Sequence, residues 1–308
     1  MLTNADIADL TDLRRALHRA PELSGQEQAT AARVAALVDG ADLVLTGLGG
    51  HGVAAEYRGT TPGPTVMIRA ELDALPIEEL STAPWASAIP GKAHLCGHDG
   101  HTTLLLGLAR LLSRRRPARG RVVLMFQPAE EDGSGAAAVI ADPRFAQIAP
   151  DWAFAIHNLP GVPLGHAWLR PGPANCASMG LRIALTGKTA HAAQPEAGTS
   201  PAPAVARLLT ALPALGQGGD LSPDYRLVTL THARLGEPAF GIAPGAAEVW
   251  ATLRTLSDAP MAALLDQAQT LARQAAADAG LTVAFTQHDV FTACTNDPDA
   301  TDRLAAAA

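Results

Sequence analysis

The sequence is poor in charged residues, in aromatic residues and in cysteine. Charged side chains make up 17% of its 308 residues and aromatic side chains 4%, and there are three cysteines. An average domain has about 25% charged residues. The net charge of −7 comes without an acidic block or a basic tract. A nucleic acid is therefore excluded as the expected partner, because its phosphates call for clustered lysine and arginine.

Long apolar runs are also lacking. No segment approaches the roughly 20 uninterrupted apolar residues that a membrane-spanning helix needs, and residues 1–6 show no basic region followed by an apolar run. We therefore expect a cytoplasmic protein without a membrane partner. The cysteines, Cys96, Cys176 and Cys294, are odd in number and widely spaced, which argues against a disulfide framework.

What is present is enough apolar sequence for a substantial core. Hydrophobic residues make up 48% of the chain, so its length permits one large domain or two of ordinary size. In the first half, helical patterns alternate with short apolar segments that predict strands at residues 53–57, 65–69, 122–126 and 152–156. This alternation predicts an α/β domain with a mainly parallel central sheet.

The pattern changes near residue 178. A strand, a helix, two strands, a helix and a strand follow one another up to residue 291, which is the split βαβ order of a small α+β domain. We therefore predict a main domain over residues 1–177 and an inserted domain over residues 178–291. Residues 292–308 would begin the return to the main domain.

Residues 93–102 read Ala-His-Leu-Cys-Gly-His-Asp-Gly-His-Thr and concentrate groups that bind metals. Thiolate, imidazole and carboxylate are the ligands of zinc and related divalent ions, and the two glycines allow a tight turn. Cys96 and His98 would project from the same side of an extended turn, while Asp99 and His101 would support the turn and the start of a helix. A polar loop with surface or helix-capping histidines is the alternative interpretation.

Further candidate ligands follow two of the predicted strands. Glu130 and Glu131 come after residues 122–126, and His157 comes after residues 152–156. Ligands of open α/β sheets bind beyond the carboxyl ends of the strands, so Glu131 and His157 could complete a site with Cys96 and His98. His157 could instead be a plain strand-end histidine, and Glu131 a residue favoured by a helix dipole.

The two adjacent glutamates should have different roles, because neighbouring side chains do not share a face. One would ligate the metal and the other would act as general base toward the attacking water. We expect a pair of divalent ions, Zn, Mn or Co, which would lower the pKa of that water and polarise a carbonyl oxygen.

Four motifs in order carry a resemblance to a known family. They are Arg-Ala-Glu-Leu-Asp-Ala-Leu-Pro at residues 69–76, the Cys/His segment at 94–102, Gln-Pro-Ala-Glu-Glu at 127–131 and Ile-His-Asn-Leu-Pro at 156–160. Together they resemble the M20 metallopeptidase family, and most closely its amidohydrolases of N-acyl amino acids, such as hippurate hydrolase, N-acetyl-amino-acid deacetylases and auxin-conjugate hydrolases. Leu17-His18 and the segment at residues 21–24 fit the same branch.

The resemblance implies a role for each candidate in the main domain. The residues it implies as metal ligands are Cys96, His98, Glu131 and His157. It further implies that Glu130 is the catalytic acid/base and that Asp73 orients the site from behind the ligands.

The resemblance also implies that the inserted domain is a ferredoxin-like lid and dimerisation domain, so that the chain forms a homodimer. His191 would stabilise the oxyanion in a partner subunit's site, and Arg254 would meet a substrate carboxylate. As alternatives, His191 could be a turn residue and Arg254 part of a strand salt bridge. Gly241 stands where the family usually has asparagine, which argues against an amide contact to substrate at that position.

The implied function is metal-dependent hydrolysis of the amide bond of a small N-acyl amino acid. An M20-type dipeptidase and a truncated, non-catalytic metal-binding or dimerising relative are the alternatives. Members of the family continue with further strands and a final histidine ligand that this sequence does not contain. We therefore expect either a piece of a longer product or a naturally shortened relative.

Overall fold

A computed structural model describes residues 1–307 of the chain. The chain divides into two compact units, one over Met1–His166 and one from Ala167 onward. No helix within the described part is long and apolar enough to cross a membrane. Each unit has a hydrophobic core of its own.

The first unit is built on a five-stranded mixed sheet. In spatial order its strands are β1 (Leu43–Leu48), β2 (Gly52–Arg58), β4 (Arg121–Gln127), β3 (Thr65–Glu71) and β5 (Trp152–Ala155). The pairs β1–β2 and β2–β4 are antiparallel, while β4–β3 and β3–β5 are parallel. The prediction of a mainly parallel sheet is therefore wrong.

The turn between β1 and β2 explains the mixed character. Gly49 and Gly50 both have positive φ, 57° and 115°, a conformation that glycine adopts without steric cost. A connection this short can only join antiparallel neighbours. The sequence pattern predicts the strand at 53–57 but not its hairpin partner β1.

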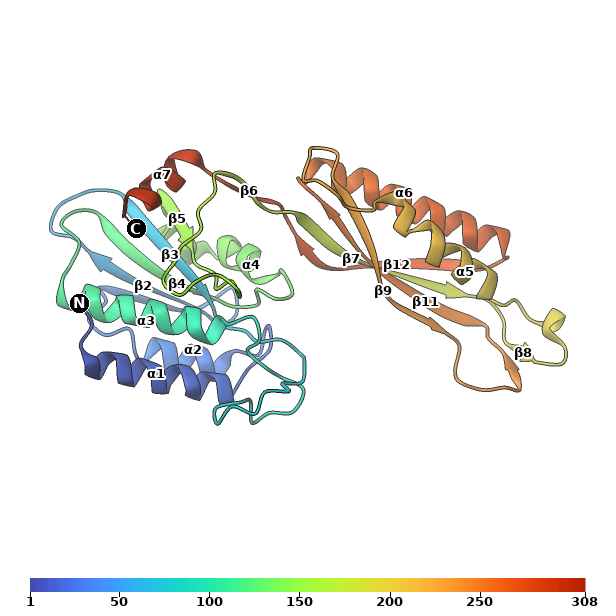
Figure 1. Ribbon diagram of the computed structural model, residues 1–308, viewed down its shortest axis with the longest axis horizontal. Helices are drawn as coiled ribbons and strands as arrows, with labels where there is room; N and C mark the ends of the chain where they lie inside the picture. The colour runs from blue at the N-terminus through green and yellow to red at the C-terminus, as the bar shows by residue number, and fades with distance from the viewer. Residues whose placement is uncertain (308) are drawn as a thin grey trace. The chain divides into compact units, whose positions relative to one another are not determined.

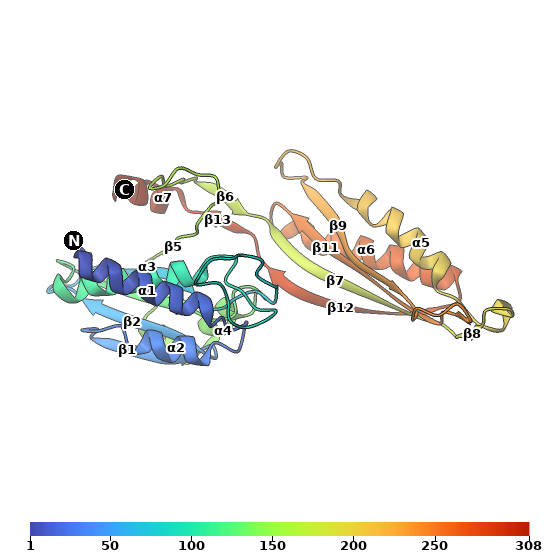
Figure 2. The same cartoon turned by 60° about the horizontal axis from the view of Figure 1, so that its bottom comes forward.

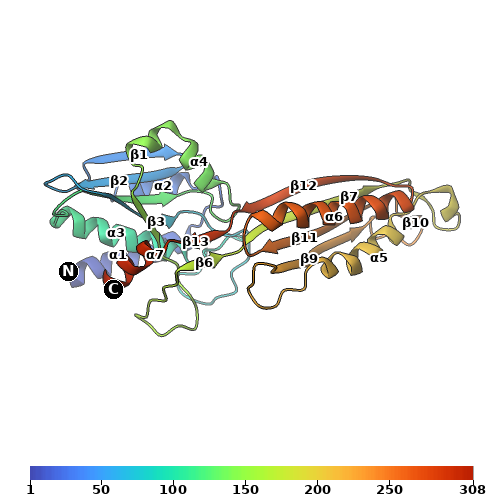
Figure 3. The same ribbon diagram turned by 90° about the horizontal axis from the view of Figure 1, so that it is seen from above.

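Helices cover both faces of this sheet. The helices α1 (Asn4–Arg19), α2 (Gln28–Ala35) and α3 (His98–Arg114) pack on one face through buried residues that include Leu10, Val34, Leu105 and Phe126. Figures 1 and 2 show α1 lying along α3. The opposite face is covered by α4 (Gly135–Ala141) and the 3-10 turn η1 (Pro143–Gln147), as Figure 3 shows for α4. The strand ends that carry the candidate ligands are thus fixed by a sheet packed on both faces.

The second unit contains a four-stranded antiparallel sheet covered by two helices. Its elements in chain order are β7 (Ala177–Thr186), α5 (Ala202–Ala211), β9 (Arg226–Leu235), β11 (Ala246–Thr255), α6 (Ala259–Asp278) and β12 (Thr282–Phe291). The spatial order is β12-β7-β11-β9. Alternate residues of β11 are buried, among them Val249, Ala251 and Leu253, and they pack with Leu208 and Leu264 of the helices. The order of elements is the one expected for residues 178–291, whereas a role as lid or dimerisation domain stays a prediction.

Short elements complete this unit. They are β6 (Gly172–Asn175), β8 (Ala190–His191), η2 (Pro195–Ala197), η3 (Pro213–Leu215), β10 (Ile242–Ala243), β13 (Cys294–Asn296) and α7 (Pro298–Ala307). The strand β6 pairs with β13, and β8 pairs with β10. The predicted assignment of residues 292–308 to the main domain stays a prediction.

Candidate metal centre

The candidate ligands of the first unit gather at one edge of its sheet. The strands β4, β3 and β5 are parallel neighbours, so their carboxyl ends meet at the same edge. Asp73 follows β3, Glu130 and Glu131 follow β4, and His157 follows β5. The helix α3 starts at His98 and therefore presents that imidazole from its first turn.

Both histidines are oriented by main-chain carbonyl groups. The Nδ1 of His98 lies 2.9 Å from the carbonyl oxygen of Asp73, and the Nδ1 of His157 lies 2.8 Å from that of Asn158. Because a carbonyl oxygen can only accept, each Nδ1 carries a proton and donates it. This leaves Nε2 of each ring as the atom available for a ligand, which is the usual arrangement of metal-binding histidines.

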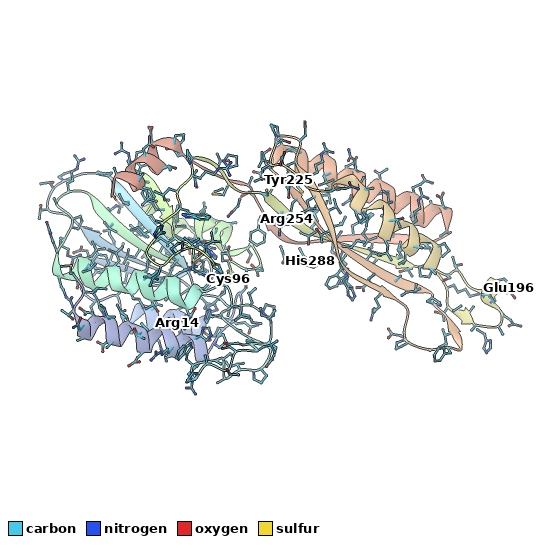
Figure 4. The ribbon with its side chains drawn as sticks, in the orientation of Figure 1. Arg14, Cys96, Glu196, Tyr225, Arg254 and His288 are labelled. Atoms are coloured by element: carbon cyan, nitrogen blue, oxygen red, sulfur yellow. The ribbon has the colours of Figure 1, made fainter. Side chains whose placement is uncertain are left out.

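The free Nε2 atoms face a thiol and two carboxyl groups. Sγ of Cys96, a residue that lies just before the N-cap of α3 (Figure 4), is 3.3 Å from Nε2 of His157. Nε2 of His98 lies 3.7 Å from Oε1 of Glu131 and 3.8 Å from Oε2 of Glu130. Within each of the groups Cys96–His98–His157 and His98–Glu130–Glu131, the ligand atoms lie within 4.8 Å of one another.

The buried polar atoms of the site fit a cation. Nε2 of His98 and Oε1 of Glu131 are both buried and have no hydrogen-bond partner among residues 1–307. Buried lone pairs without a donor are costly and call for an explanation. A set of one thiolate, two imidazoles and carboxylates suits zinc and similar divalent ions, so the residues present fit the expected metal.

Charged neighbours shift the pKa values of this cluster. Burial alone would raise the pKa of Asp73, but hydrogen bonds from His98, from the backbone N–H of Glu131 and from Ser24 outweigh it and lower the pKa to about 2. Burial would lower the pKa of His98, yet Asp73 and Cys96 raise it to about 11. Asp73 is thus a fixed anion behind His98, and Nε2 is the atom at which a proton and a cation would compete.

Burial also acts on one of the two glutamates. It raises the pKa of Glu131, and the neighbouring carboxylate of Glu130 adds to the effect. Since burial and a like charge both disfavour the ionised form, this carboxylate gains from an adjacent cation.

A second buried cluster beside the ligands was not identified from the sequence. Nδ1 of His101 donates to Oε2 of Glu71 at 2.7 Å, and its Nε2 accepts from the backbone N–H of Asn158 at 3.0 Å. Glu71 and His101 could form a metal group with His98 by distance, but they already satisfy each other. They position Asn158, next to His157, and no local motif signals a contact between residues so far apart in the chain.

Asp99 and His101 do not serve only the turn and the helix start, as the sequence suggested. Asp99 is buried and accepts from Nδ1 of His18 at 2.9 Å and from Nε of Arg14 at 2.8 Å. Both partners lie on α1, so this pair ties the start of α3 to the first helix.

His191 and Arg254 belong to the second unit. His191 is exposed in the short strand β8, and its Nδ1 accepts from the backbone N–H of Ala193 at 3.1 Å. Arg254 is exposed on β11, as Figure 4 shows, and forms no ion pair with the residues that the structure describes. Gly241 places its carbonyl 3.0 Å from the N–H of Ala192, so it supports the loop of His191 through its backbone.

Comparison with known families decides the relationship. The model of peptidase family M20/M25/M40 matches residues 67–308. The chain belongs to this family. The resemblance seen in the four motifs is thereby confirmed, and the M20 chain is a hydrolytic enzyme by membership.

Relatives of the M20 chain include named deacylases. It is 31% identical over 291 residues to the N-acetylcysteine deacetylase of Bacillus subtilis, covering 94% of this chain and 76% of that protein. It is 34% identical over 254 residues to the IAA-amino acid hydrolase ILR1-like 5 of Arabidopsis thaliana, covering 80% of this chain and 56% of the plant protein. The M20 chain thus spans about three quarters of one relative and little more than half of the other.

Solved structures agree with the fold. The YXEP protein of Bacillus subtilis, described as a dinuclear metal-binding peptidase of the M20 family, superposes with a TM-score of 0.73 at 29% identity, covering 98% of this chain and 81% of that one. The aminobenzoyl-glutamate utilization protein of Klebsiella pneumoniae gives a TM-score of 0.74 at 25% identity, covering 97% and 79%. The mixed α/β fold is therefore that of M20 proteins.

Proposed function

We propose that this M20 protein hydrolyses the amide bond of small N-acyl amino acids. The observation that carries the proposal is the convergence of two imidazole Nε2 atoms, each freed by a carbonyl-bound Nδ1–H, on a thiol and two carboxyl groups. The named activities of the deacetylase and of the plant hydrolase support the substrate class.

In this proposal Cys96, His98, Glu131 and His157 hold two divalent ions. Bound ions of this kind polarise a carbonyl oxygen and make water a better nucleophile at neutral pH. Asp73 keeps its negative charge and orients His98 from behind. The choice among Zn, Mn and Co stays open, because the donor set suits all three.

Glu130 is the proposed general base. It lies next to Glu131 but is not needed as a ligand, and its half-buried carboxylate stands 3.8 Å from Nε2 of His98. There it can accept a proton from the attacking water and pass it to the nitrogen of the leaving amine. Both transfers are made by the one carboxyl group, so its loss slows the reaction at two steps.

The second unit has the proposed role of a lid and dimerisation domain. His191 would stabilise the developing oxyanion in the site of a partner subunit, and the exposed guanidinium of Arg254 would bind the substrate carboxylate. A homodimer is required by the first of these roles.

A mixture of His191→Ala and Glu130→Gln proteins tests this role. In a hybrid dimer, the His191→Ala subunit keeps Glu130 and its partner keeps His191, so the mixture should regain activity only if His191 acts in trans. Sedimentation shows whether dimers form, and an activity assay measures the recovery.

Replacing Glu130 with glutamine tests the main proposal. We expect Glu130→Gln to bind metal with the stoichiometry of the natural protein, because the ligands are intact, and to lose about 10²- to 10⁴-fold in kcat, because the base is absent. Metal content by elemental analysis and release of amino acid from N-acetyl, N-benzoyl and dipeptide substrates are the measurements.

Two outcomes would point elsewhere. Full activity of Glu130→Gln would remove the assigned base. Metal binding by the natural chain without release from any substrate would favour the non-catalytic alternative, and release from dipeptides alone would favour a dipeptidase.

A further inference from the structure

The two glutamates of the site follow a residue in an unfavourable conformation. Ala129 has φ of 47°, in the left-handed region that residues with a Cβ rarely adopt. It is buried and stands between β4 and Glu130. The direction in which the chain leaves Ala129 decides where both carboxyl groups point, so the turn must be held by its surroundings.

The peptide groups around Ala129 are fixed by hydrogen bonds from three sides. The N–H of Ala129 donates to Oε1 of Glu27 at 2.8 Å. Its carbonyl oxygen accepts from the N–H of Gly135 at 2.9 Å. The N–H of Glu131 donates to Oδ2 of Asp73, also at 2.9 Å. Two of these partners are side chains, and of the two Glu27 has no place in the proposed site, whereas Asp73 does.

Glu27 is a fully buried carboxyl group with an unusual position. Its exposed fraction is 0%, and Oε2 has no hydrogen-bond partner within residues 1–307. Oε1 also accepts from the N–H of Gly25 at 2.9 Å, which fixes the side chain against its own loop. A carboxyl group is costly to bury, and the hydrogen bond that Glu27 makes with a distant part of the described chain is the one from the N–H of Ala129.

We propose that Glu27 is a positioning residue that holds Ala129 in its left-handed conformation and so directs Glu130 and Glu131 into the metal centre. This inference rests on the proposed function of that centre. Without Glu27 the buried N–H of Ala129 would have no acceptor, and the turn would be free to relax to negative φ. The two following carboxyl groups would then move away from His98.

A pair of matched variants tests the role of Glu27. Glu22 lies in the same loop and its carboxylate accepts from the N–H groups of Ala29 and Thr30 in α2, and among the described residues it forms no hydrogen bond with the turn at Ala129. We expect Glu27→Ala to lower the affinity for Zn²⁺ by about 10- to 100-fold, the range seen when a residue behind a ligand is removed. Glu22→Ala should lose stability but change Zn²⁺ affinity less than about twofold. Zn²⁺ titration against a chelator, with Tm of each apoprotein, measures both.

Two further variants separate positioning from a general loss of structure. Glu27→Gln keeps an oxygen acceptor for Ala129 and should retain most of the Zn²⁺ affinity. Ala129→Gly, introduced into Glu27→Ala, should restore part of the lost affinity, because glycine adopts positive φ without help. If Glu22→Ala weakens Zn²⁺ binding as much as Glu27→Ala, or if the added Ala129→Gly restores nothing, the positioning role is wrong.

Hydrogen exchange distinguishes failure of this inference from failure of the metal site itself. If the natural protein binds no Zn²⁺, the proposed centre is wrong, but the role of Glu27 in the turn can still be read. Glu27→Ala should then accelerate exchange of the amide hydrogens of Ala129 and Glu131, and Glu22→Ala should not. Unchanged exchange at these amides would overturn the proposal.

Discussion

Gly97 is the residue that lets a thiol and an imidazole approach the same point. It separates Cys96 from His98 and caps α3 with φ of 97°. A Cβ at this position would overlap the side-chain amide of Asn158, which packs there because His101 holds it. Glycine is therefore required twice, by the backbone conformation and by the close packing of Asn158.

We expect Gly97→Ala to weaken both stability and metal binding. Positive φ alone costs an alanine about 1–2 kcal/mol, and the displaced Asn158 would disturb His157 in addition. Gly91→Ala is the matched control, because Gly91 also has positive φ, 70°, but nothing lies within 4 Å of an added Cβ. In urea unfolding, Gly91→Ala should lose as much stability as Gly97→Ala or less. In Zn²⁺ titration, Gly91→Ala should bind the metal as tightly as the natural protein. Equal metal affinities in both variants would contradict the role of Asn158.

At the residue scale, the sequence predicts ligand types better than it predicts their supports. Cys96 and His98 are identified by the local concentration of metal-binding groups, and Glu131 and His157 by their places after strands, although the roles of all four stay predictions. The residues that orient these ligands could not be identified from the sequence. Glu27 and Ala129 are 102 positions apart, and the pairing of His101 with Glu71 depends on how α3 packs on β3. No periodicity or spacing encodes such contacts.

Among the elements, α1 and α3 are joined by a charged cluster around Asp6. Asp6 is buried and accepts from Arg114 at 2.6 and 2.7 Å and from Arg110 at 3.1 Å. It also completes the N-terminal capping box with Thr3. The hydrogen bond from Arg114, with help from Thr3, lowers the pKa of Asp6 well below its usual range.

This shift predicts an acid-sensitive contribution to stability. Because the folded pKa lies below the unfolded value near 4, the contribution is complete above about pH 4 and is lost as the pH falls toward the folded value. Asp6→Asn should therefore lower Tm at pH 7, and the difference from the natural protein should shrink below pH 4. Asp9→Asn, at an exposed partner of Arg110, should have a small effect at every pH. A Tm difference for Asp6→Asn that grows toward low pH would contradict the sign.

The elements themselves were predicted unevenly. The strands at residues 122–126 and 152–156 were found within one residue at each end, because uninterrupted apolar runs mark buried strands. The sequence does not predict β1, because Leu43–Leu48 contains Gly47, is followed by two further glycines that suggest a turn, and does not alternate strictly between apolar and polar residues. Without β1 the hairpin was invisible, so the sheet was expected to be mainly parallel.

For the whole molecule, the main consequence is that the candidate metal centre lies within one unit. All its candidate ligands, and the residues that orient them, lie in Met1–His166, whereas the core around Leu208 belongs to the second unit. The change of sequence pattern near residue 178 predicted a second α+β domain. It could not predict the boundary between His166 and Ala167, because residues 161–176 carry no strong periodicity.

We expect Leu208→Ala to destabilise the second unit while sparing metal binding. Leu208 is 0% exposed, and truncating such a leucine costs about 2–5 kcal/mol. The unfolding transition of the second unit should move to lower urea concentration, and Zn²⁺ affinity should stay within about twofold. Parallel loss of Zn²⁺ affinity would show that the centre depends on the second unit.

The carbonyl partners of His98 and His157 also affect how the centre tolerates mutation. The atoms that fix each imidazole tautomer belong to the main chain, at Asp73 and Asn158, and no side-chain substitution at those positions removes a carbonyl oxygen. Mutations can therefore change the charge around the two imidazole rings more readily than they can change which ring nitrogen, Nδ1 or Nε2, faces the candidate metal centre. A change of metal preference could accordingly arise by exchange of the thiol or a carboxylate while both imidazoles keep their orientation.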